Sequence, residues 1–374
     1  MFKIFINCAL HIAPSLSSEL HAIGYPNHSV EKHGVKLEGD FSDIIKLNLK
    51  LRTAHRVLLT IDGFIAKSAK ELQKKIYKIA WDHYIPENEY ISIESHTDSP
   101  EIRDARYLNL IIKDAICDCM RERTGYRPDS GKEKKGVCIF VHWMENFAFV
   151  YLDTSGESLA KHNYRKIPGK APLQETLAAS FILTANFSGG THFVNPMCGS
   201  GTIAIEAALY LSNRYPGMLR PQYAFQHIKG YDENLYKKIR SQIRSESKQN
   251  IKGKIIATDI DPEAIAAAQK NALTAGVNDL ITFDVCSFEQ TEIPEGGGVI
   301  ILNPYYGERE GDILELEKVY EYIGDFFKNN CKGYSGYIFT ANRDLAKKVG
   351  LKTKRKYEYR NSTLDARLLE YELY

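Results

Sequence analysis

The sequence lacks the patterns that mark metal-binding, secreted and membrane proteins. Its seven cysteines form no C-x-x-C pair and no cysteine–histidine spacing typical of a zinc site. Unpaired cysteines of this kind are typical of reduced thiols in the cytoplasm. The opening stretch MFKIFINCALHIAPSL favours a strand over a signal peptide, and no window is apolar enough to cross a membrane. We therefore expect a cytoplasmic protein with no metal site and no membrane contact.

The chain also lacks a strong net charge, an internal repeat and a low-complexity tract. A net charge of +2 over 374 residues does not by itself indicate a nucleic-acid partner. Basic residues nevertheless gather in four clusters, and tyrosines are interleaved with them. Positive charge neutralises phosphate and aromatic rings stack on unpaired bases, so four clusters together favour a polyanionic partner, although each alone is typical of a solvated surface. The clusters lie at 67–78, 121–135, 161–170 and 347–360, with Tyr77, Tyr126, Tyr164, Tyr357 and Tyr359 among them.

Two patterns of secondary structure divide the chain. The first 150 residues mix short strand-like runs with helical periods, which predicts an α+β arrangement. A stretch rich in Gly, Pro and Ser at 153–174 predicts a linker. The expected strands are 2–8, 57–62, 90–94, 107–111, 137–142 and 147–152, the expected helices are 13–22, 41–49, 68–80 and 112–124, and 121–136 is expected to be a loop.

After the linker, strands alternate with helices. This alternation predicts an α/β domain with a doubly wound, mostly parallel sheet, and the last two strand-like runs predict a terminal antiparallel hairpin. The expected helices are 173–186, 262–276, 313–329 and 342–349, and the expected strands are 254–261, 280–285, 297–303 and 335–341, followed by KYEYRN and ARLLEYELY.

A glycine motif, FVNPMCGSGTIAIEAA, joins a strand ending at Val194 to an apolar helix. Gly199 and Gly201 let the backbone turn tightly and approach a ligand at the helix N-terminus. A phosphate-binding P-loop would need a lysine before Thr202, and none is present. A dinucleotide site, or a nucleoside cofactor without pyrophosphate such as S-adenosylmethionine, both fit. A plain strand–turn–helix joint is the alternative without a ligand.

Acidic residues stand at the ends of the next two expected strands. Asp259 closes its strand, where one carboxylate can accept both ribose hydroxyls of a cofactor. Asp261 precedes Pro262 and is expected to cap the following helix, and capping is the alternative role for Asp259 as well. Asp284 closes the next strand, where it can accept from the amino group of adenine, although a solvated loop carboxylate is an equal alternative.

The stretch VIILNPYYGERE reads as a buried strand that ends in Asn303 and Pro304. Open α/β sheets bind ligands at the carboxyl edge of their strands, where these residues are expected. An Asn side-chain oxygen and a backbone carbonyl held by proline are two acceptors that can grip a planar amine, and a neighbouring ring can stack on its base. Positioning and electrostatics then suffice for that amine to attack an electrophile, and no strong base is required. A simple type I turn is the alternative.

Together these motifs resemble S-adenosylmethionine-dependent class I amino-methyltransferases with an Asn-Pro-Pro-Tyr signature. The join DTSGESLAKHNYR…APLQETLAA is similar to the one found in THUMP-containing RNA guanine methyltransferases. The resemblance covers the whole chain. It implies a ferredoxin-like region at 1–55, a THUMP RNA-binding domain at 56–155, a linker at 156–172 and a methyltransferase domain at 173–374.

The resemblance also implies roles for particular residues and a reaction, methylation of the 2-amino group of guanine in 23S rRNA or, in a neighbouring branch, in tRNA. This chain departs from the family pattern at Asn195, where Asp is usual, and at Tyr305, which replaces the second proline. The implied catalytic residues are Asn303, Pro304 and Tyr306, and the implied cofactor-binding residues are Glu175, Asn195, Pro196, Gly199, Gly201, Thr202, Asp259 and Asp284.

Three other functions compete with RNA guanine methylation. The same grip suits a ring amine of adenine or cytosine in DNA, which the THUMP-like half disfavours. The two departures from the family pattern are compatible with a non-catalytic RNA-binding factor that kept a methylase fold. A nicotinamide dehydrogenase is the most distant alternative. Methylation at a ring carbon would need a cysteine nucleophile, and no cysteine flanks Asn303.

Overall fold

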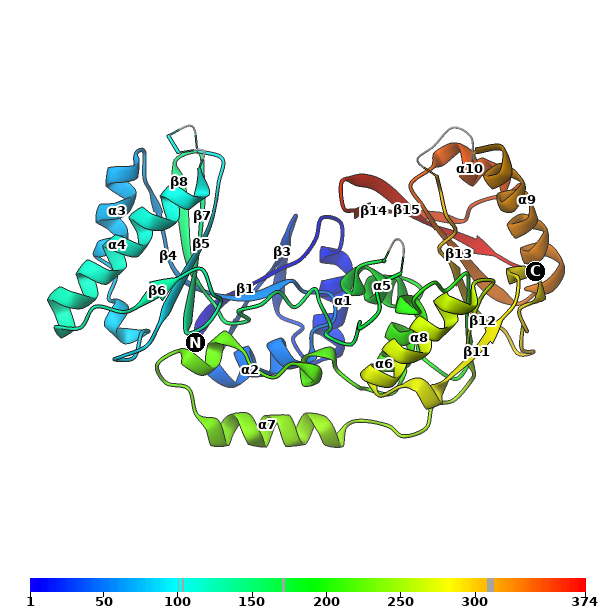
Figure 1. Cartoon of the computed structure of the whole chain (residues 1–374), viewed down its shortest axis with the longest axis horizontal. Helices are drawn as coiled ribbons and strands as arrows, with labels where there is room; N and C mark the ends of the chain where they lie inside the picture. The colour runs from blue at the N-terminus through cyan, green and yellow to red at the C-terminus, as the bar shows by residue number, and fades with distance from the viewer. Residues whose placement is uncertain (100, 103, 170–171, 308–312) are drawn as a thin grey trace.

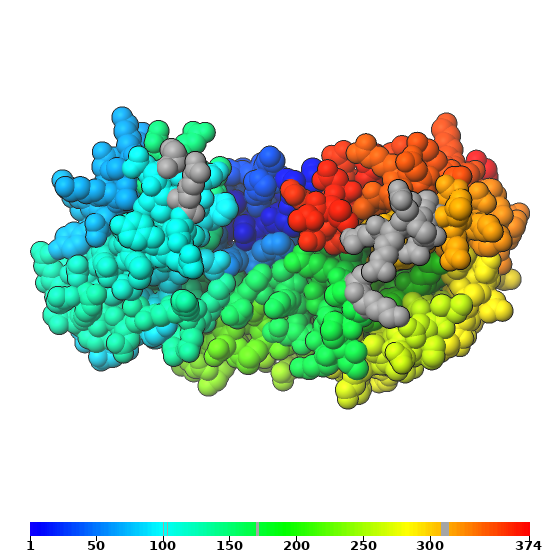
Figure 2. Space-filling view, turned by 45° about the horizontal axis from the view of Figure 1, so that its top comes forward, coloured from blue at the N-terminus to red at the C-terminus, as the bar shows by residue number. Residues whose placement is uncertain are grey.

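A computed structural model describes residues 1–99, 101–102, 104–169, 172–307 and 313–374. The molecule is elongated, with the amino-terminal half at one end and the carboxyl-terminal half at the other (Figures 1 and 2). Each half is built on its own sheet. Among the described residues, no helix combines the length and the apolar character needed to cross a membrane.

The amino-terminal half contains one eight-stranded sheet in the order β2-β3-β1-β4-β8-β7-β5-β6. Its register aligns Ile4 with Leu59, Leu59 with Leu152, and Leu152 with Ile139, so these buried residues share one face. The helices of this half pack on that face, which becomes the core. The strands are β1 (Phe2–Asn7), β2 (His28–Glu31), β3 (Gly34–Gly39), β4 (Arg56–Ile65), β5 (Ile91–Thr97), β6 (Ser130–Gly131), β7 (Val137–Met144) and β8 (Phe147–Asp153), and the helices are α1 (Ala13–Ala22), α2 (Phe41–Lys50), α3 (Ala69–Tyr77) and α4 (Ala105–Thr124).

One expected strand in this half is wrong. Residues 107–111 form the first turns of α4, because Leu108, Ile112 and Ile116 are buried at helical spacing while Leu110 is exposed. The helix also takes the first residues of the expected loop at 121–136. Strands β2 and β3 were not expected, although Val35, Lys36, Leu37 and Glu38 of β3 alternate between buried apolar and exposed charged side chains.

The carboxyl-terminal half contains a seven-stranded sheet in the order β11-β10-β9-β12-β13-β15-β14. The first five strands in this order are parallel, and β15 pairs antiparallel with β13 and β14. The predicted doubly wound sheet and its terminal hairpin are therefore confirmed. The strands are β9 (His192–Pro196), β10 (Ile255–Asp259), β11 (Ile281–Val285), β12 (Gly298–Leu302), β13 (Tyr334–Thr340), β14 (Arg355–Asn361) and β15 (Leu364–Glu372).

Helices cover both faces of this sheet, which explains the unbroken apolar run in β12. Val299 and Ile301 belong to the core beneath α6 and α8, whereas Ile300 and Leu302 belong to the core beneath α9. A strand buried on both faces reads as continuous Val and Ile without alternation. The helices are α5 (Glu175–Thr184), α6 (Thr202–Leu211), α7 (Glu233–Ser245), α8 (Pro262–Ala275), α9 (Ile313–Asn330) and α10 (Arg343–Lys348).

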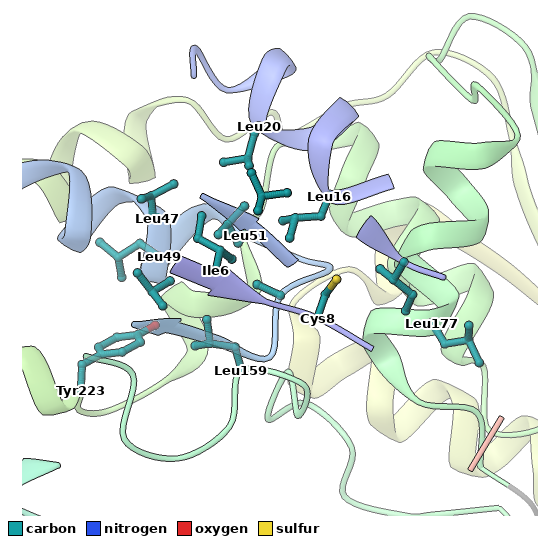
Figure 3. Close-up of a cluster of buried hydrophobic side chains, with 14 of the residues drawn as sticks. Ile6, Cys8, Leu16, Leu20, Leu47, Leu49, Leu51, Leu159, Leu177 and Tyr223 are labelled. Carbon is teal, nitrogen blue, oxygen red and sulfur yellow. The ribbon is translucent and has the colours of Figure 1, made fainter. Parts of the chain in front are cut away.

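A segment between α6 and β10, residues 212–249, ties the two halves together. It carries α7, which runs along the underside of the molecule and was not expected (Figure 1). The Arg220 guanidinium donates to the backbone oxygens of Ser158 and Glu157 at 2.9 and 2.7 Å. Figure 3 shows the shared core, in which Ile6 of β1, Leu159 of the linker and Leu177 of α5 belong to one cluster. The two halves therefore share one continuous core.

Candidate functional site

The glycine loop joins β9 to α6 at the carboxyl edge of the sheet. Gly199 and Gly201 have φ angles of 54° and 81°, in the left-handed region that favours glycine. A Cβ on Gly199 would meet nothing within 4 Å, whereas one on Gly201 would lie 2.8 Å from the Ala268 Cβ. Gly199 therefore faces open space where a ligand can approach, and Gly201 is needed for the close packing of α6 on α8. Pro196 ends β9 and Thr202 begins α6, and both are buried.

Asp259 lies beside this loop, at the end of the neighbouring strand β10. Its Oδ2 accepts from the Gly199 N–H at 2.9 Å, and its Oδ1 accepts from the Asp261 N–H at 3.0 Å. Two backbone donors therefore fix the carboxylate while further lone pairs remain for a ligand. Asp261 caps α8 through the Glu263 N–H at 2.9 Å, as predicted.

Asp284 lies on β11, the strand next to β10, and is exposed. The register places Asp259 opposite Val285, so the two carboxylates belong to adjacent strand ends. Ile260 and Val285 are 73% and 47% exposed at the same edge, so the edge presents apolar surface beside the two carboxylates. Sequence reasoning missed both residues. The available signal was the large apolar residue that directly follows each strand-end aspartate, in Asp259-Ile260 and Asp284-Val285.

Asn195 and Asn303 bring two carboxamides to the ends of β9 and β12. Asn195 is fully buried, and its Nδ2 donates to the Ile301 oxygen at 2.8 Å, which links β9 to β12. The side-chain Oδ1 atoms of both asparagines are buried with no hydrogen-bond partner among the described residues. Buried polar atoms are normally satisfied, so the Asn303 Oδ1 at this sheet edge is a candidate acceptor for a donor-bearing ligand.

The aromatic residues after Asn303 have different environments. Pro304 is buried, and the Tyr306 hydroxyl accepts from the Asn361 Nδ2 at 2.9 Å, at the end of β14. Tyr305 is 59% exposed. The structure therefore offers a tethered ring and an exposed ring beside the amide. The last residues of the stretch NPYYGER, 308 and 309, lie outside the described residues.

Glu175 is connected to the glycine loop by Arg165 of the linker, which contacts both. It begins α5 and is buried, and its Oε1 accepts from the Arg165 Nε at 3.0 Å. Arg165 also donates to the Leu173 oxygen at 2.6 Å and to the Ser200 Oγ in the glycine loop at 3.3 Å. In the sequence, Arg165 stands out only as part of a basic cluster, because nothing in the spacing of its neighbours shows which carboxylate it contacts.

The thiol in the glycine loop is not poised to react. Burial, reinforced by the charge of Asp259, raises the pKa of the Cys198 thiol far above its usual value. All seven cysteines are free, and within the described ranges no three His, Cys, Asp or Glu side chains come together to hold a metal ion.

The parallel sheet, its glycine loop and the side chains at the neighbouring strand ends define an α/β methyltransferase domain of the Rossmann-like kind. The chain belongs to the RMKL-like methyltransferase family, whose domain model matches residues 162–370. Models of the RlmL ferredoxin-like domain and the THUMP domain match residues 3–58 and 66–153. The resemblance seen in the sequence is thereby confirmed.

Proteins with similar sequences are named as RNA methyltransferases. A putative RNA methyltransferase of Synechocystis is 31% identical over 99% of this chain and 96% of its own length. The ribosomal RNA large subunit methyltransferase K/L of Syntrophotalea carbinolica is 32% identical over 99% of this chain. The chain spans about half the length of the K/L relatives, since it covers 53% of that protein.

Solved structures share the whole architecture. A possible methylase from Clostridium difficile superposes with a TM-score of 0.92 at 31% identity, over 100% of this chain and 98% of its own. A putative methyltransferase complexed with SAH superposes with a TM-score of 0.91 at 29% identity, over 99% of this chain and 98% of its own.

Proposed function

We propose that this protein transfers a methyl group from S-adenosylmethionine to the exocyclic 2-amino group of a guanosine in RNA, and that the RNA is 23S rRNA. The observation that carries the proposal is the buried Oδ1 of Asn303, which has no hydrogen-bond partner among the described residues and lies beside Pro304 at the sheet edge that holds the glycine loop. The names of the K/L relatives and the THUMP match support RNA as the substrate class. The proposed setting is the cytoplasm, with no metal and no membrane involved.

The described residues fit the proposed cofactor. Open space above Gly199 leaves room for the methionine part of the molecule, next to the N-terminus of α6. The Asp259 carboxylate, fixed by two backbone N–H groups, is suited to accept both ribose hydroxyls. Ile260 and Val285 offer apolar surface for the adenine ring, and Asp284 an acceptor for its amino group. The bound cofactor would supply an electrophilic methyl group.

Asn303 would hold the acceptor amine. The nitrogen of an exocyclic amine is a weak nucleophile, because its lone pair is delocalised into the ring. Two hydrogen bonds, accepted by the Asn303 Oδ1 and the Pro304 backbone oxygen, would orient both N–H groups and turn the lone pair toward the methyl group. Tyr306 or Tyr305 would stack on the base. The proton leaves to solvent after transfer, so the site needs no strong base.

The amino-terminal half would dock the RNA, and the target base would leave its stack to reach Asn303. Exposed lysines on and beside α3 supply positive charge, as the cluster at 67–78 predicted. Two of the interleaved tyrosines cannot stack on bases, since Tyr164 and Tyr359 are buried in the core. Those two are a correction to the sequence reasoning, because the alternation of basic and aromatic residues does not reveal burial.

Nucleoside mass spectrometry tests the proposal. Ribosomal and transfer RNA from cells lacking this gene would be digested separately, before and after treatment with the purified protein and labelled S-adenosylmethionine. We expect 2-methylguanosine to be missing from 23S rRNA and restored by the protein. Restoration in tRNA alone would move the substrate to the tRNA branch. No labelled nucleoside in RNA, with labelled N6-methyladenine in DNA, would replace the proposal with a DNA methylase.

A further inference from the structure

A short stretch of the linker, residues 162–167, contacts both halves of the molecule, and we refer to it as the junction segment. The His162 ring lies between the Arg52 oxygen of the amino-terminal half, at 3.0 Å, and the Glu206 Oε1 of α6, at 2.7 Å. The Tyr164 hydroxyl donates to the same Glu206 oxygen at 2.8 Å. His162 and Tyr164 are buried, so the start of the segment is fixed between the halves.

The end of the junction segment is held against the glycine loop by Asn271 of α8. Its Oδ1 accepts from the N–H groups of Lys166 and Ile167 at 2.8 and 3.1 Å. Its Nδ2 donates to the Ile167 and Ser200 oxygens at 3.0 and 3.1 Å. One buried carboxamide thus joins the backbone of the junction segment to the backbone of the glycine loop.

Arg165 lies between the buried start of the junction segment and the part held by Asn271. It contacts three separate residues at or near the glycine loop and the start of α5. Its guanidinium donates to the Glu175 carboxylate, to the Leu173 oxygen and to the Ser200 hydroxyl. The first two flank the start of α5, and the third lies between Gly199 and Gly201. A guanidinium offers five donors in a rigid planar fork, whereas a lysine ammonium is a single point of charge. Only the fork can span acceptors that point from three directions.

Glu175 depends on this contact. Its side chain is buried, and among the described residues its carboxylate hydrogen-bonds to Arg165. A buried carboxylate that loses its cation must become hydrated or protonated, and either change would move the start of α5. The Leu173 oxygen would lose its donor at the same time. Losing the Arg165 contacts would therefore change the positions of the glycine loop and of α5, and would leave the sheet in place.

We propose that Arg165 is a positioning residue for cofactor binding: it holds Glu175 and Ser200 in the arrangement that accepts the methionine part of S-adenosylmethionine. This inference rests on the proposed function. It places a determinant of cofactor affinity in the segment between the RNA-docking half and the methyltransferase domain, outside the glycine loop and the strand ends. His162 and Tyr164 fix the same segment through contacts with both halves. The position of Arg165 therefore depends on how the two halves pack together.

Binding of SAH to the full chain, measured by isothermal titration calorimetry, tests the inference without requiring turnover. Arg165→Met is expected to weaken SAH binding about 10- to 100-fold, since it removes charge-assisted hydrogen bonds. Arg165→Lys, which keeps the charge and loses the fork, should recover only part of the affinity. Arg244→Met, an exposed arginine on α7, is the matched control and should bind SAH like the native protein.

Two further readouts separate positioning from simple loss of structure. With saturating RNA, Arg165→Met should raise the KM for S-adenosylmethionine while kcat stays within about threefold, whereas misfolding would lower kcat through the active fraction. Glu175→Gln combined with Arg165→Met should bind SAH no more weakly than the worse single variant, because the two side chains act as one unit. If Arg165→Met fails to fold, the Arg165→Lys titration decides alone.

Several outcomes would overturn the inference. Native-like SAH affinity in both Arg165 variants would show that the contact is only structural. Full additivity of the Glu175 and Arg165 effects would show that Arg165 does not act through Glu175. Failure of the native protein itself to bind SAH would instead contradict the proposed function.

Discussion

Replacing Asn195 by Asp should destabilise this protein in a strongly pH-dependent way. The Asn195 Nδ2–H donates to the Ile301 oxygen at 2.8 Å inside the sheet, and the amide has a second carbonyl, that of Pro196, at 3.5 Å. Two acceptors on one side identify that atom as the nitrogen. A carboxylate has no hydrogen to offer, so Asn195→Asp would place a negative charge against carbonyl oxygens in a fully buried position.

The lower-cost response is for the introduced carboxyl group to bind a proton and donate it to Ile301. The folded-state pKa of that group is then raised above its unfolded value of about 3.9. For a carboxyl group with a raised folded pKa, the penalty is absent below the unfolded pKa and grows as pH rises toward the folded pKa. At about 1.4 kcal/mol per pH unit, it amounts to roughly 1.5 kcal/mol at pH 5 and roughly 4 kcal/mol at pH 7.

Urea unfolding followed by far-ultraviolet circular dichroism at pH 5 and pH 7 measures this difference. Asn195→Leu is the matched control, since it removes the same hydrogen bond, adds no titratable group and should cost about 1–3 kcal/mol at both pH values. An equal loss of stability for Asn195→Asp at pH 5 and pH 7 would refute the reasoning. It would mean that the carboxylate finds another donor or water, and that the bond to Ile301 does not hold β9 to β12.

Four further substitutions probe the site directly. Asn303→Ala should lower kcat about 100- to 1,000-fold in the methylation assay and leave SAH affinity within about threefold, and a comparable loss of SAH affinity would place Asn303 in cofactor binding instead. Asp259→Ala should weaken SAH binding about 10- to 100-fold in calorimetry, because charge-assisted hydrogen bonds are lost, and unchanged affinity would contradict the ribose role. Gly201→Ala should lower the free energy of unfolding by about 2–4 kcal/mol in the same urea titration, because the substituted residue would keep a positive φ and its new Cβ would lie 2.8 Å from the Ala268 Cβ. Gly199→Ala also has a positive φ, but its Cβ would meet open space, so it should cost only about 1–2 kcal/mol.

Local patterns predicted most of the carboxyl-terminal fold correctly. The apolar run before Asn303 identified a buried strand, and paired glycines after β9 identified the loop at its carboxyl edge. The predicted cap at Asp261 is present. These features are legible because each depends on a few consecutive residues, through a side-chain period, a φ angle or a capping side chain.

The same patterns failed where the deciding contact is distant in the chain. Residues 107–111 alternate like a strand, but Leu108 begins a stripe at helical spacing, with Ile112 and Ile116, that belongs to the core. Tyr164 and Tyr359 lie among basic residues that suggest an RNA surface, and both are buried by packing from other segments. Helix α7 was overlooked although its buried Tyr236, Ile239 and Ile243 recur at helical spacing, and only its packing against the distant helix α2 required the tertiary structure.

The sequence by itself determined the class of domain and named Asn303, Gly199 and Asp259, because a parallel sheet brings its strand ends to one edge whatever the loops do. The tertiary structure decided which side chains share that edge. It showed that Asn195 donates to β12, that Tyr306 is tethered to the terminal hairpin, and that Arg165 of the linker grips Glu175. Such contacts join residues far apart in sequence, and their direction depends on side-chain geometry that no local pattern encodes.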